Sequence, residues 1–221
     1  MDLHTTMSRH DTAKVIFKAS QKLLYPIETA FCALSNFHRY ANEVGDLKIQ
    51  KTNFVVLVSS FLFLAGKSTE QFRKISEVLL VVLRIGGYKF DISDQEKYKQ
   101  VNDALIEQEQ KILRALSFET NVDLPYAFIL NIAKSMNFSC QTVQFAWGLV
   151  NELILFPESH GKLFTPVTMA VIVLYIAQQA FHDEPDLIDS ECWWNTYQVS
   201  NENLVNLLLV IKELLVTGIA S

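Results

Sequence analysis

The sequence predicts an all-α protein made of two consecutive five-helix bundles. Glycine and proline are scarce, with seven and five among 221 residues, and no stretch alternates apolar and polar residues over the length of a strand. Half of the residues are hydrophobic and 19% are charged, as expected for a folded globular chain. The same order of elements also occurs twice, with an uncharged apolar helix in third place each time. This repeat predicts two similar domains, at residues 11–120 and 121–221.

The first three helices follow from capping residues and apolar spacing. Residues 12–24 form the first helix, with Asp11 placed to cap it, and Pro26 suits the first turn of the second. The third covers residues 52–66 and has apolar side chains on every face, so we expect it to be surrounded by protein. Lys67 follows directly, where the apolar run stops. The prediction is a buried central helix with a lysine at its rim.

The fourth and fifth helices complete the N-terminal bundle. Ser68 and Gln71 have the spacing of a capping box and would start the fourth helix, which Gly86-Gly87 would end. The fifth helix is expected to end near Phe118. Each helix has one apolar face, formed in the fourth by Phe72, Ile75, Leu79, Val82 and Leu83, and in the fifth by Val101, Leu105, Ile112 and Leu116.

The C-terminal half repeats this order after a short link at residues 121–125. Expected helices cover residues 125–136, 141–156 and 166–181, followed by a short piece with two tryptophans and a last helix at 201–216. Twenty residues at 163–182 carry no charge, but Pro166 and Gln178-Gln179 leave an apolar centre shorter than the ~20 residues of a membrane span. We therefore expect a buried core helix and no membrane association.

Composition and motifs argue against several functional classes. The net charge of −5 and the lack of a basic run oppose direct binding to nucleic acid. Three dispersed cysteines without a CxxC pair indicate reduced thiols and no zinc site. A charged N-terminus argues against a signal peptide. No GxGxxG, P-loop, GxSxG or HExxH motif occurs, and no histidine follows a glutamate by three residues, as in di-iron bundles. We expect no catalytic residue, cofactor or metal.

Two charged residues remain ambiguous on the sequence alone. Lys67 follows the central helix, and Glu109 lies four residues from both Leu105 and Leu113, at the edge of the apolar face of the fifth helix. An edge carboxylate is well placed to meet a rim lysine. Alternatively, Lys67 complements the negative end of its helix dipole and Glu109 is an ordinary surface charge.

Several stretches resemble the cyclin box. FHRY at 37–40, LFLAGKSTE at 62–70 and LIEQEQKILRALSF at 105–118 resemble three of its signature stretches, in the same order and spacing. In the second half, WWNTY before the last apolar helix resembles the transcription-type cyclins of the L, K, T and Q kinds. The resemblance covers residues 11–216 and implies two consecutive cyclin-box repeats.

This resemblance implies a regulatory subunit without catalytic activity, located in the nucleus with the cytoplasm as a second location. Such a subunit binds and activates a cyclin-dependent kinase by fixing the C-helix of the kinase in its active position. The family's lysine and glutamate that hold the kinase backbone correspond to Lys67 and Glu109. Its apolar kinase contacts correspond to Leu64, Leu113 and Phe118, although helical spacing alone also allows these to be core residues.

Two departures from the family pattern affect the predicted contacts. Where the family has two glutamates after the lysine, this chain has Thr69 and Glu70, so only Glu70 remains as a polar contact. The first helix carries AKVIF at 13–17 in place of MRAIL, which argues against substrate docking through an RxL peptide. Two other classes remain as alternatives: a general-transcription-factor-like core of two repeats that binds promoter DNA, and a helical metalloenzyme. The first requires a basic face and the second a bound iron or zinc.

Overall fold

The structure, a computed structural model, describes residues 7–45, 49, 51–87, 94–157, 164–184 and 190–219. Within these ranges the regular elements are helices, and the only β-type pairing is an isolated antiparallel bridge between Met7 and Ile49. The prediction of an all-α fold is confirmed. By its internal contacts the chain divides into two compact units, Met1–Val122 and Asp123–Ser221.

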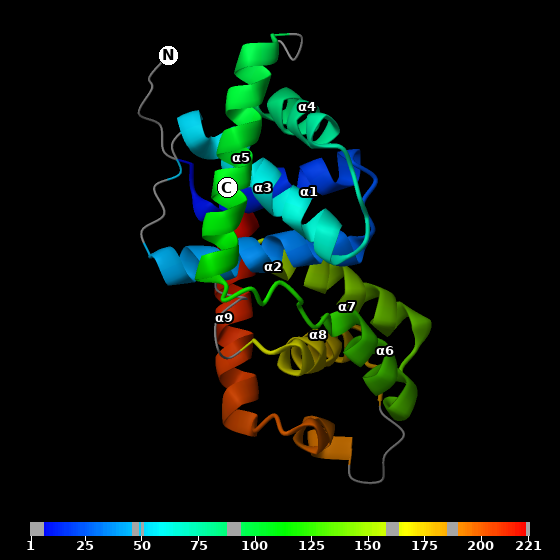
Figure 1. Cartoon of the computed structure of the whole chain (residues 1–221). Helices are drawn as coiled ribbons and strands as arrows, with labels where there is room; N and C mark the ends of the chain where they lie inside the picture. Colours follow the sequence, from blue (N-terminus) through cyan, green and yellow to red (C-terminus); the bar gives the residue numbers. More distant parts are fainter. Residues whose placement is uncertain are drawn as a thin grey trace. The chain divides into compact units, whose positions relative to one another are not determined.

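The N-terminal unit is organised around α3, which packs against each of the other four helices (Figure 1). Phe54, Val58, Phe61, Leu62 and Ala65 of α3 are all buried, so this helix is surrounded by protein as its apolarity predicts. The five helices are α1 (Arg9–Lys22), α2 (Ile27–Val44), α3 (Lys51–Ser68), α4 (Ile75–Gly86) and α5 (Gln95–Ala115).

The C-terminal unit has the same plan. Its α8 packs against the four other elements, and its residues 169–174 are all buried. Trp193 is 1% exposed and packs edge-on against Phe138, with ring centroids 5.6 Å apart. The elements are α6 (Pro125–Met136), α7 (Cys140–Leu153), α8 (Pro166–Phe181), the 3-10 element η2 (Ser190–Tyr197) and α9 (Asn201–Ile219). Among the described helices, α8 included, none has both the length and the apolarity needed to cross a membrane.

The first helix starts earlier than predicted. Its N-cap is Ser8, whose hydroxyl oxygen accepts a hydrogen bond from the Asp11 backbone N–H at 3.0 Å. Asp11, predicted to be the cap, lies in the first turn of α1, where its carboxylate accepts from the Ser8 hydroxyl at 2.6 Å. The prediction was wrong by one turn because the serine and the aspartate exchange hydrogen bonds.

The predicted start of the fourth helix was also wrong. Ser68 is the last residue of α3, and its hydroxyl donates to the Leu64 carbonyl at 3.1 Å within that helix. The next helix begins at Ile75. Phe72, expected on its apolar face, lies in the connection and is 67% exposed. The end at Gly87 is confirmed, since this glycine has the left-handed φ of 68° that ends a helix.

Candidate functional site

Lys67 and Glu109 form an ion pair between the last turn of α3 and the middle of α5. The Lys67 Nζ atom also lies 4.6 Å from the centre of the Phe63 ring, one turn earlier on α3. The side chain of Glu109 is 12% exposed, whereas that of Lys67 is 38% exposed. The carboxylate and the ring therefore hold an ammonium group whose outer side still faces solvent. An ammonium has three donors, so Lys67 can bind a further acceptor there.

The turn that follows Lys67 is tightly built. The Gln71 N–H donates to the Gly66 carbonyl at 2.8 Å and the Glu70 N–H to the Lys67 carbonyl at 3.3 Å, which closes the end of α3. Glu70 takes the left-handed position, with φ of 59°, and its side chain is exposed. Glycine is usual at this position because it has no Cβ. A glutamate at this position strains the backbone, and it places an exposed carboxylate three residues after Lys67.

The end of α5 turns in the same way. The Phe118 N–H donates to the Leu113 carbonyl at 2.8 Å, and Ser117 and Phe118 have left-handed φ values of 51° and 62°. The Phe118 side chain points outward and is 70% exposed. Non-glycine residues with positive φ are uncommon, and they concentrate at functional sites. Both helices that carry the ion pair thus end in an outward-facing side chain.

Helix α2 anchors the segment after α5. Arg39 Nη1 donates to the Glu119 carbonyl at 2.8 Å, and Asn36 Nδ2 donates to the Thr120 carbonyl at 3.1 Å. Cys32, one turn before Asn36 on α2, is buried, and this burial raises the pKa of its thiol. These contacts fix residues 119–120 and so fix the direction of Phe118. The FHRY stretch contributes Arg39 to this arrangement.

The predicted contact residues fall into two groups. Lys67, Glu70 and Phe118 are exposed, and Leu113 is partly buried on α5. Leu64 is only 5% exposed, so it packs inside the unit and offers little surface to a partner.

Sequence reasoning missed Phe63, whose position four residues before Lys67 is the signal that could have identified it.

Thr69, which replaces a family glutamate, faces inward. Its hydroxyl lies 2.8 Å from the Thr29 hydroxyl on α2 and donates to the Ala65 carbonyl at 2.8 Å. The position is therefore used for packing α2 against the end of α3. Neither hydroxyl contact contributes charge to the surface around Lys67.

The arrangement is suited to binding a protein. Among the described residues, no group of three histidine, cysteine, aspartate or glutamate side chains could hold a metal ion. What the surface offers is a supported ammonium, an exposed carboxylate and an exposed phenyl ring. An apolar anchor beside charged groups is typical of protein interfaces.

Comparison with known families decides the class of protein. The N-terminal domain of cyclins matches residues 2–121, which is more than half of the chain. The chain belongs to the cyclin family. Its relatives include Cyclin-T1-5 of Arabidopsis thaliana, 24% identical over 83% of this chain and 32% of the relative. Cyclin-K of Danio rerio is 23% identical over 86% of this chain and 44% of the relative. These are T and K kinds, so the predicted transcription-type resemblance is confirmed.

Solved structures agree on the cyclin fold. A chain of the yeast RNA polymerase II CTD kinase complex CTDK-1 superposes with a TM-score of 0.70, at 16% identity, over 89% of this chain and 61% of that one. A viral cyclin from herpesvirus saimiri gives 0.65 at 14% identity, over 95% and 86%. At these identities the likeness concerns the fold. The chain spans between 27% and 61% of the length of the curated relatives it matches.

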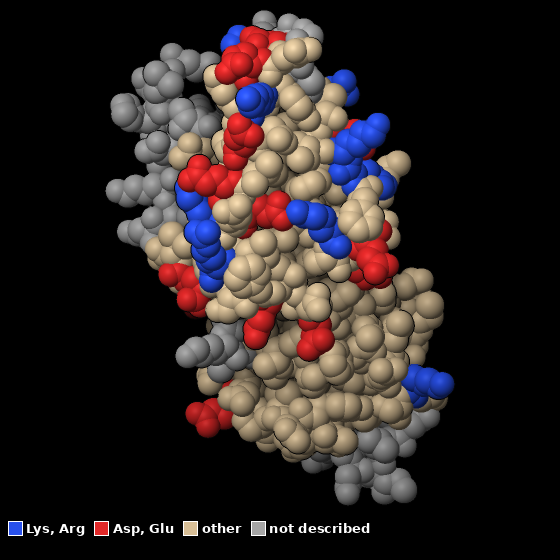
Figure 2. Space-filling view, viewed as in Figure 1, with Lys and Arg blue, Asp and Glu red and all other residues tan. Residues whose placement is uncertain are grey.

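The charges do not favour the promoter-DNA alternative, which the comparisons do not support either. Only three of the 19 lysines and arginines lie in residues 123–221, against ten of the 24 acidic residues. Figure 2 accordingly shows lysine and arginine mainly over the N-terminal unit, whereas the visible face of the C-terminal unit is mostly uncharged. A phosphate backbone would be repelled by a unit with this balance.

Proposed function

We propose that this cyclin binds and activates a cyclin-dependent kinase through the surface formed by Lys67, Glu109, Glu70, Leu113 and Phe118. The observation that carries the proposal is the ion pair between Lys67 and Glu109, on the two residues that the cyclin-box resemblance selects. In this proposal Lys67 donates to backbone carbonyls at the start of the kinase C-helix. Glu109 orients the lysine, and Phe118 is covered by apolar side chains of the kinase.

The effect on the kinase is a shift of its conformational equilibrium. Catalysis in protein kinases requires an ion pair between a lysine of the N-lobe and a glutamate of the C-helix. A cyclin that binds only the inward position of the C-helix favours the state in which this pair is formed. The chain itself transfers no phosphoryl group, and its contribution is the position of the helix.

The N-terminal domain, residues 11–120, would be the kinase-binding cyclin box, with residues 121–221 as the second repeat. The central helix of the second repeat ends in Gln178-Gln179, where the first ends in Gly66-Lys67. Gln178 is already used internally, because its Oε1 accepts from the Trp193 indole N–H at 2.8 Å. The C-terminal unit therefore lacks a rim lysine at the end of α8, which supports placing the kinase on the N-terminal unit.

The kinase is proposed to be of the transcription-associated type. Support comes from the T and K kinds among the relatives and from the fold shared with a subunit of an RNA polymerase II CTD kinase. In this proposal the protein acts in the nucleus.

A pull-down from nuclear extract tests the proposal. The tagged chain should retain a cyclin-dependent kinase identified by mass spectrometry, and Lys67→Glu and Glu109→Lys should each lose it. Lys97→Glu is the matched control, because Lys97 is a surface lysine paired with Asp94 at the start of α5. Equal retention of the kinase by Lys67→Glu and by the wild-type chain would rule out this site.

A further inference from the structure

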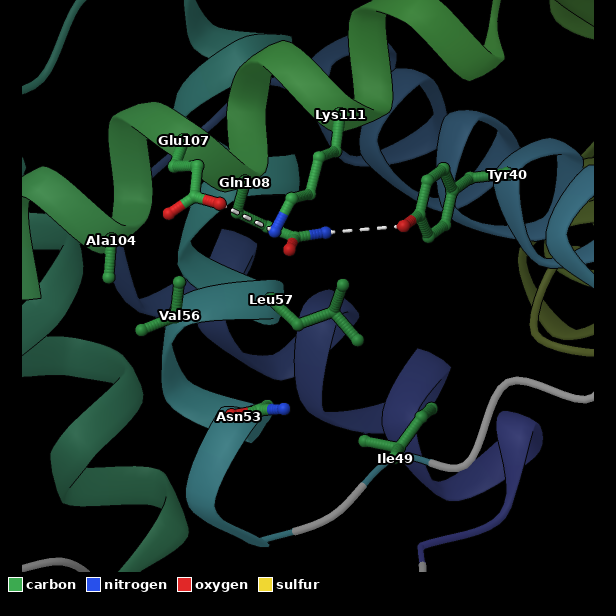
Figure 3. A pocket seen from close by; sticks show the side chains of 9 residues that line it. All are labelled: Tyr40, Ile49, Asn53, Val56, Leu57, Ala104, Glu107, Gln108 and Lys111. Carbon is green, nitrogen blue, oxygen red and sulfur yellow. Dashed lines mark hydrogen bonds and ion pairs between the residues drawn. The ribbon is translucent and has the colours of Figure 1, made fainter.

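The N-terminal unit contains a pocket that the proposed kinase contact does not use. It has a volume of about 400 Å³ and opens between α2, α3 and α5 (Figure 3). In this view Gln108 and Lys111 descend from α5, Asn53 lies on α3 on the opposite side, and Leu57 and Ile49 point into the space between them. The volume lies within the range of about 300–1,000 Å³ that is usual for ligand sites.

The floor of the pocket is apolar and rigidly packed. Ile49, Leu57 and Tyr40 are 2%, 7% and 7% exposed, and Val56 adds a partly buried aliphatic wall. The Tyr40 ring is fixed edge-on against Phe61, with centroids 5.6 Å apart. An aliphatic side chain placed on this floor would leave water at about 25 cal/mol per Å² of apolar surface covered.

Polar groups at the pocket have unused hydrogen-bonding capacity. Gln108 Nε2 donates to the Tyr40 hydroxyl at 3.4 Å, which leaves the Gln108 carbonyl oxygen and the Tyr40 hydroxyl hydrogen available. The Asn53 carboxamide, across the pocket on α3, forms no hydrogen bond with the part of the chain that the structure describes. The pocket thus presents donors and acceptors on two opposite sides.

The charges at the rim cancel. Lys111 Nζ lies 2.8 Å from Glu107 Oε1, and this hydrogen bond together with the lysine charge lowers the pKa of Glu107. Glu107 is therefore charged at neutral pH and paired with Lys111. Glu107 would repel an anionic ligand and Lys111 would repel a cationic one, so the rim favours an uncharged ligand.

We propose that this pocket binds a short extended segment of a partner protein, with one aliphatic side chain on the floor and the adjacent backbone amides on Asn53 and Gln108. A peptide group offers one N–H and one C=O in opposite directions, which two facing carboxamides can match. A nucleotide or sugar phosphate would need unpaired cations, and a sugar has no aliphatic group for Ile49 and Leu57.

The pocket and the kinase surface occupy different faces of α5. Successive residues of an α-helix are about 100° apart. Ala104, Glu107, Gln108 and Lys111 therefore share one face, and Glu109 lies about 150° from the middle of that face. A segment bound in the pocket therefore leaves Glu109 uncovered. Binding of the segment does not rest on the proposed kinase function, since it is measured on the chain alone.

The test is a selection from a bead library of random octapeptides with acetylated and amidated ends, using the purified full chain. We expect enrichment of peptides with one leucine, isoleucine, valine or methionine among uncharged residues. An enriched peptide should then shift the side-chain amide signals of Asn53 and Gln108 in the NMR spectrum of the wild-type chain, and leave that of the exposed Gln110 unchanged.

Variants provide the second measurement. Asn53→Ala and Gln108→Ala should each weaken binding of the enriched peptide about fivefold, as expected for one lost hydrogen bond, while Gln110→Ala binds like the wild type. Ala104→Trp should abolish binding by filling the pocket. The proposal is overturned if no peptide is enriched, if the enriched peptides are charged, if the Asn53 and Gln108 signals stay unshifted, or if all variants bind equally.

Discussion

Gly66 lies at the end of α3, and replacing it with alanine tests how the turn that follows Lys67 is packed. A Cβ atom at this position would lie 2.6 Å from the Tyr25 hydroxyl oxygen and 2.9 Å from the Gln71 carbonyl oxygen. The second contact is with backbone that is itself bonded back to the Gly66 carbonyl at 2.8 Å. The Gln71 carbonyl therefore cannot move away without opening the turn.

The magnitude follows from two opposing effects. Overpacking of this kind costs about 1–3 kcal/mol, and two contacts below 3 Å place Gly66→Ala near the upper end. Alanine in place of glycine stabilises a helix by about 1 kcal/mol, so the net loss is about 2 kcal/mol. Gly148 in α7 is the matched control, because a Cβ there meets nothing within 4 Å. Gly148→Ala should therefore gain about 1 kcal/mol.

Urea unfolding separates the two changes. All three tryptophans lie at positions 147, 193 and 194, so their fluorescence reports on the C-terminal unit, whereas far-UV circular dichroism reports on both units. Gly66→Ala should lower the midpoint of the dichroism transition, and Gly148→Ala should raise that of the fluorescence transition. An equal or higher midpoint for Gly66→Ala would refute the close packing of α3 against Tyr25 and the turn.

Three further predictions concern single interactions. Ser8→Ala removes the α1 cap and should cost about 1 kcal/mol in urea unfolding. Burial alone would raise the pKa of Asp183. Hydrogen bonds from Thr142 and Ser139 together lower the pKa by more than burial raises it, so the net pKa is depressed. Its stabilisation should be complete above about pH 4 and lost as the pH falls through the folded value; Asp183→Asn should remove this part of the acid transition. Trp193→Ala should cost about 3–5 kcal/mol, because the ring is buried. An unchanged midpoint or acid transition in any of these variants would contradict the corresponding interaction.

The sequence was most informative where a pattern extended over several turns. The third helix of each half was predicted to be central, and α3 and α8 each pack against all other elements of their unit. An uncharged helix with apolar side chains on every face has no stable position except one surrounded by protein. The predicted approach of Lys67 and Glu109 also agrees with the structure, since both lie at the edges of long, well-defined helices.

Shorter patterns were less reliable because the same residues can form different hydrogen bonds. Ser68 and Gln71 have capping-box spacing, yet the Ser68 hydroxyl bonds back into α3. The sequence does not show which carbonyl accepts the hydrogen bond from a serine hydroxyl. The left-handed turns at Glu70 and Phe118 were equally hidden, because no glycine marks them. The pocket beside Gln108 could not be predicted, since it depends on how Ile49 from the connection after α2 is placed.

The most direct test of the central claim is the concentration of this cyclin that half-activates a purified transcription-associated cyclin-dependent kinase. Removing one charged partner of a buried interface pair costs about 2 kcal/mol or more, which corresponds to a roughly 30-fold loss of affinity. The account predicts that Lys67→Glu needs at least that much more cyclin, while Lys97→Glu behaves like the wild type. Activation by Lys67→Glu at the wild-type concentration, or no activation of any such kinase by the wild-type chain, would contradict it.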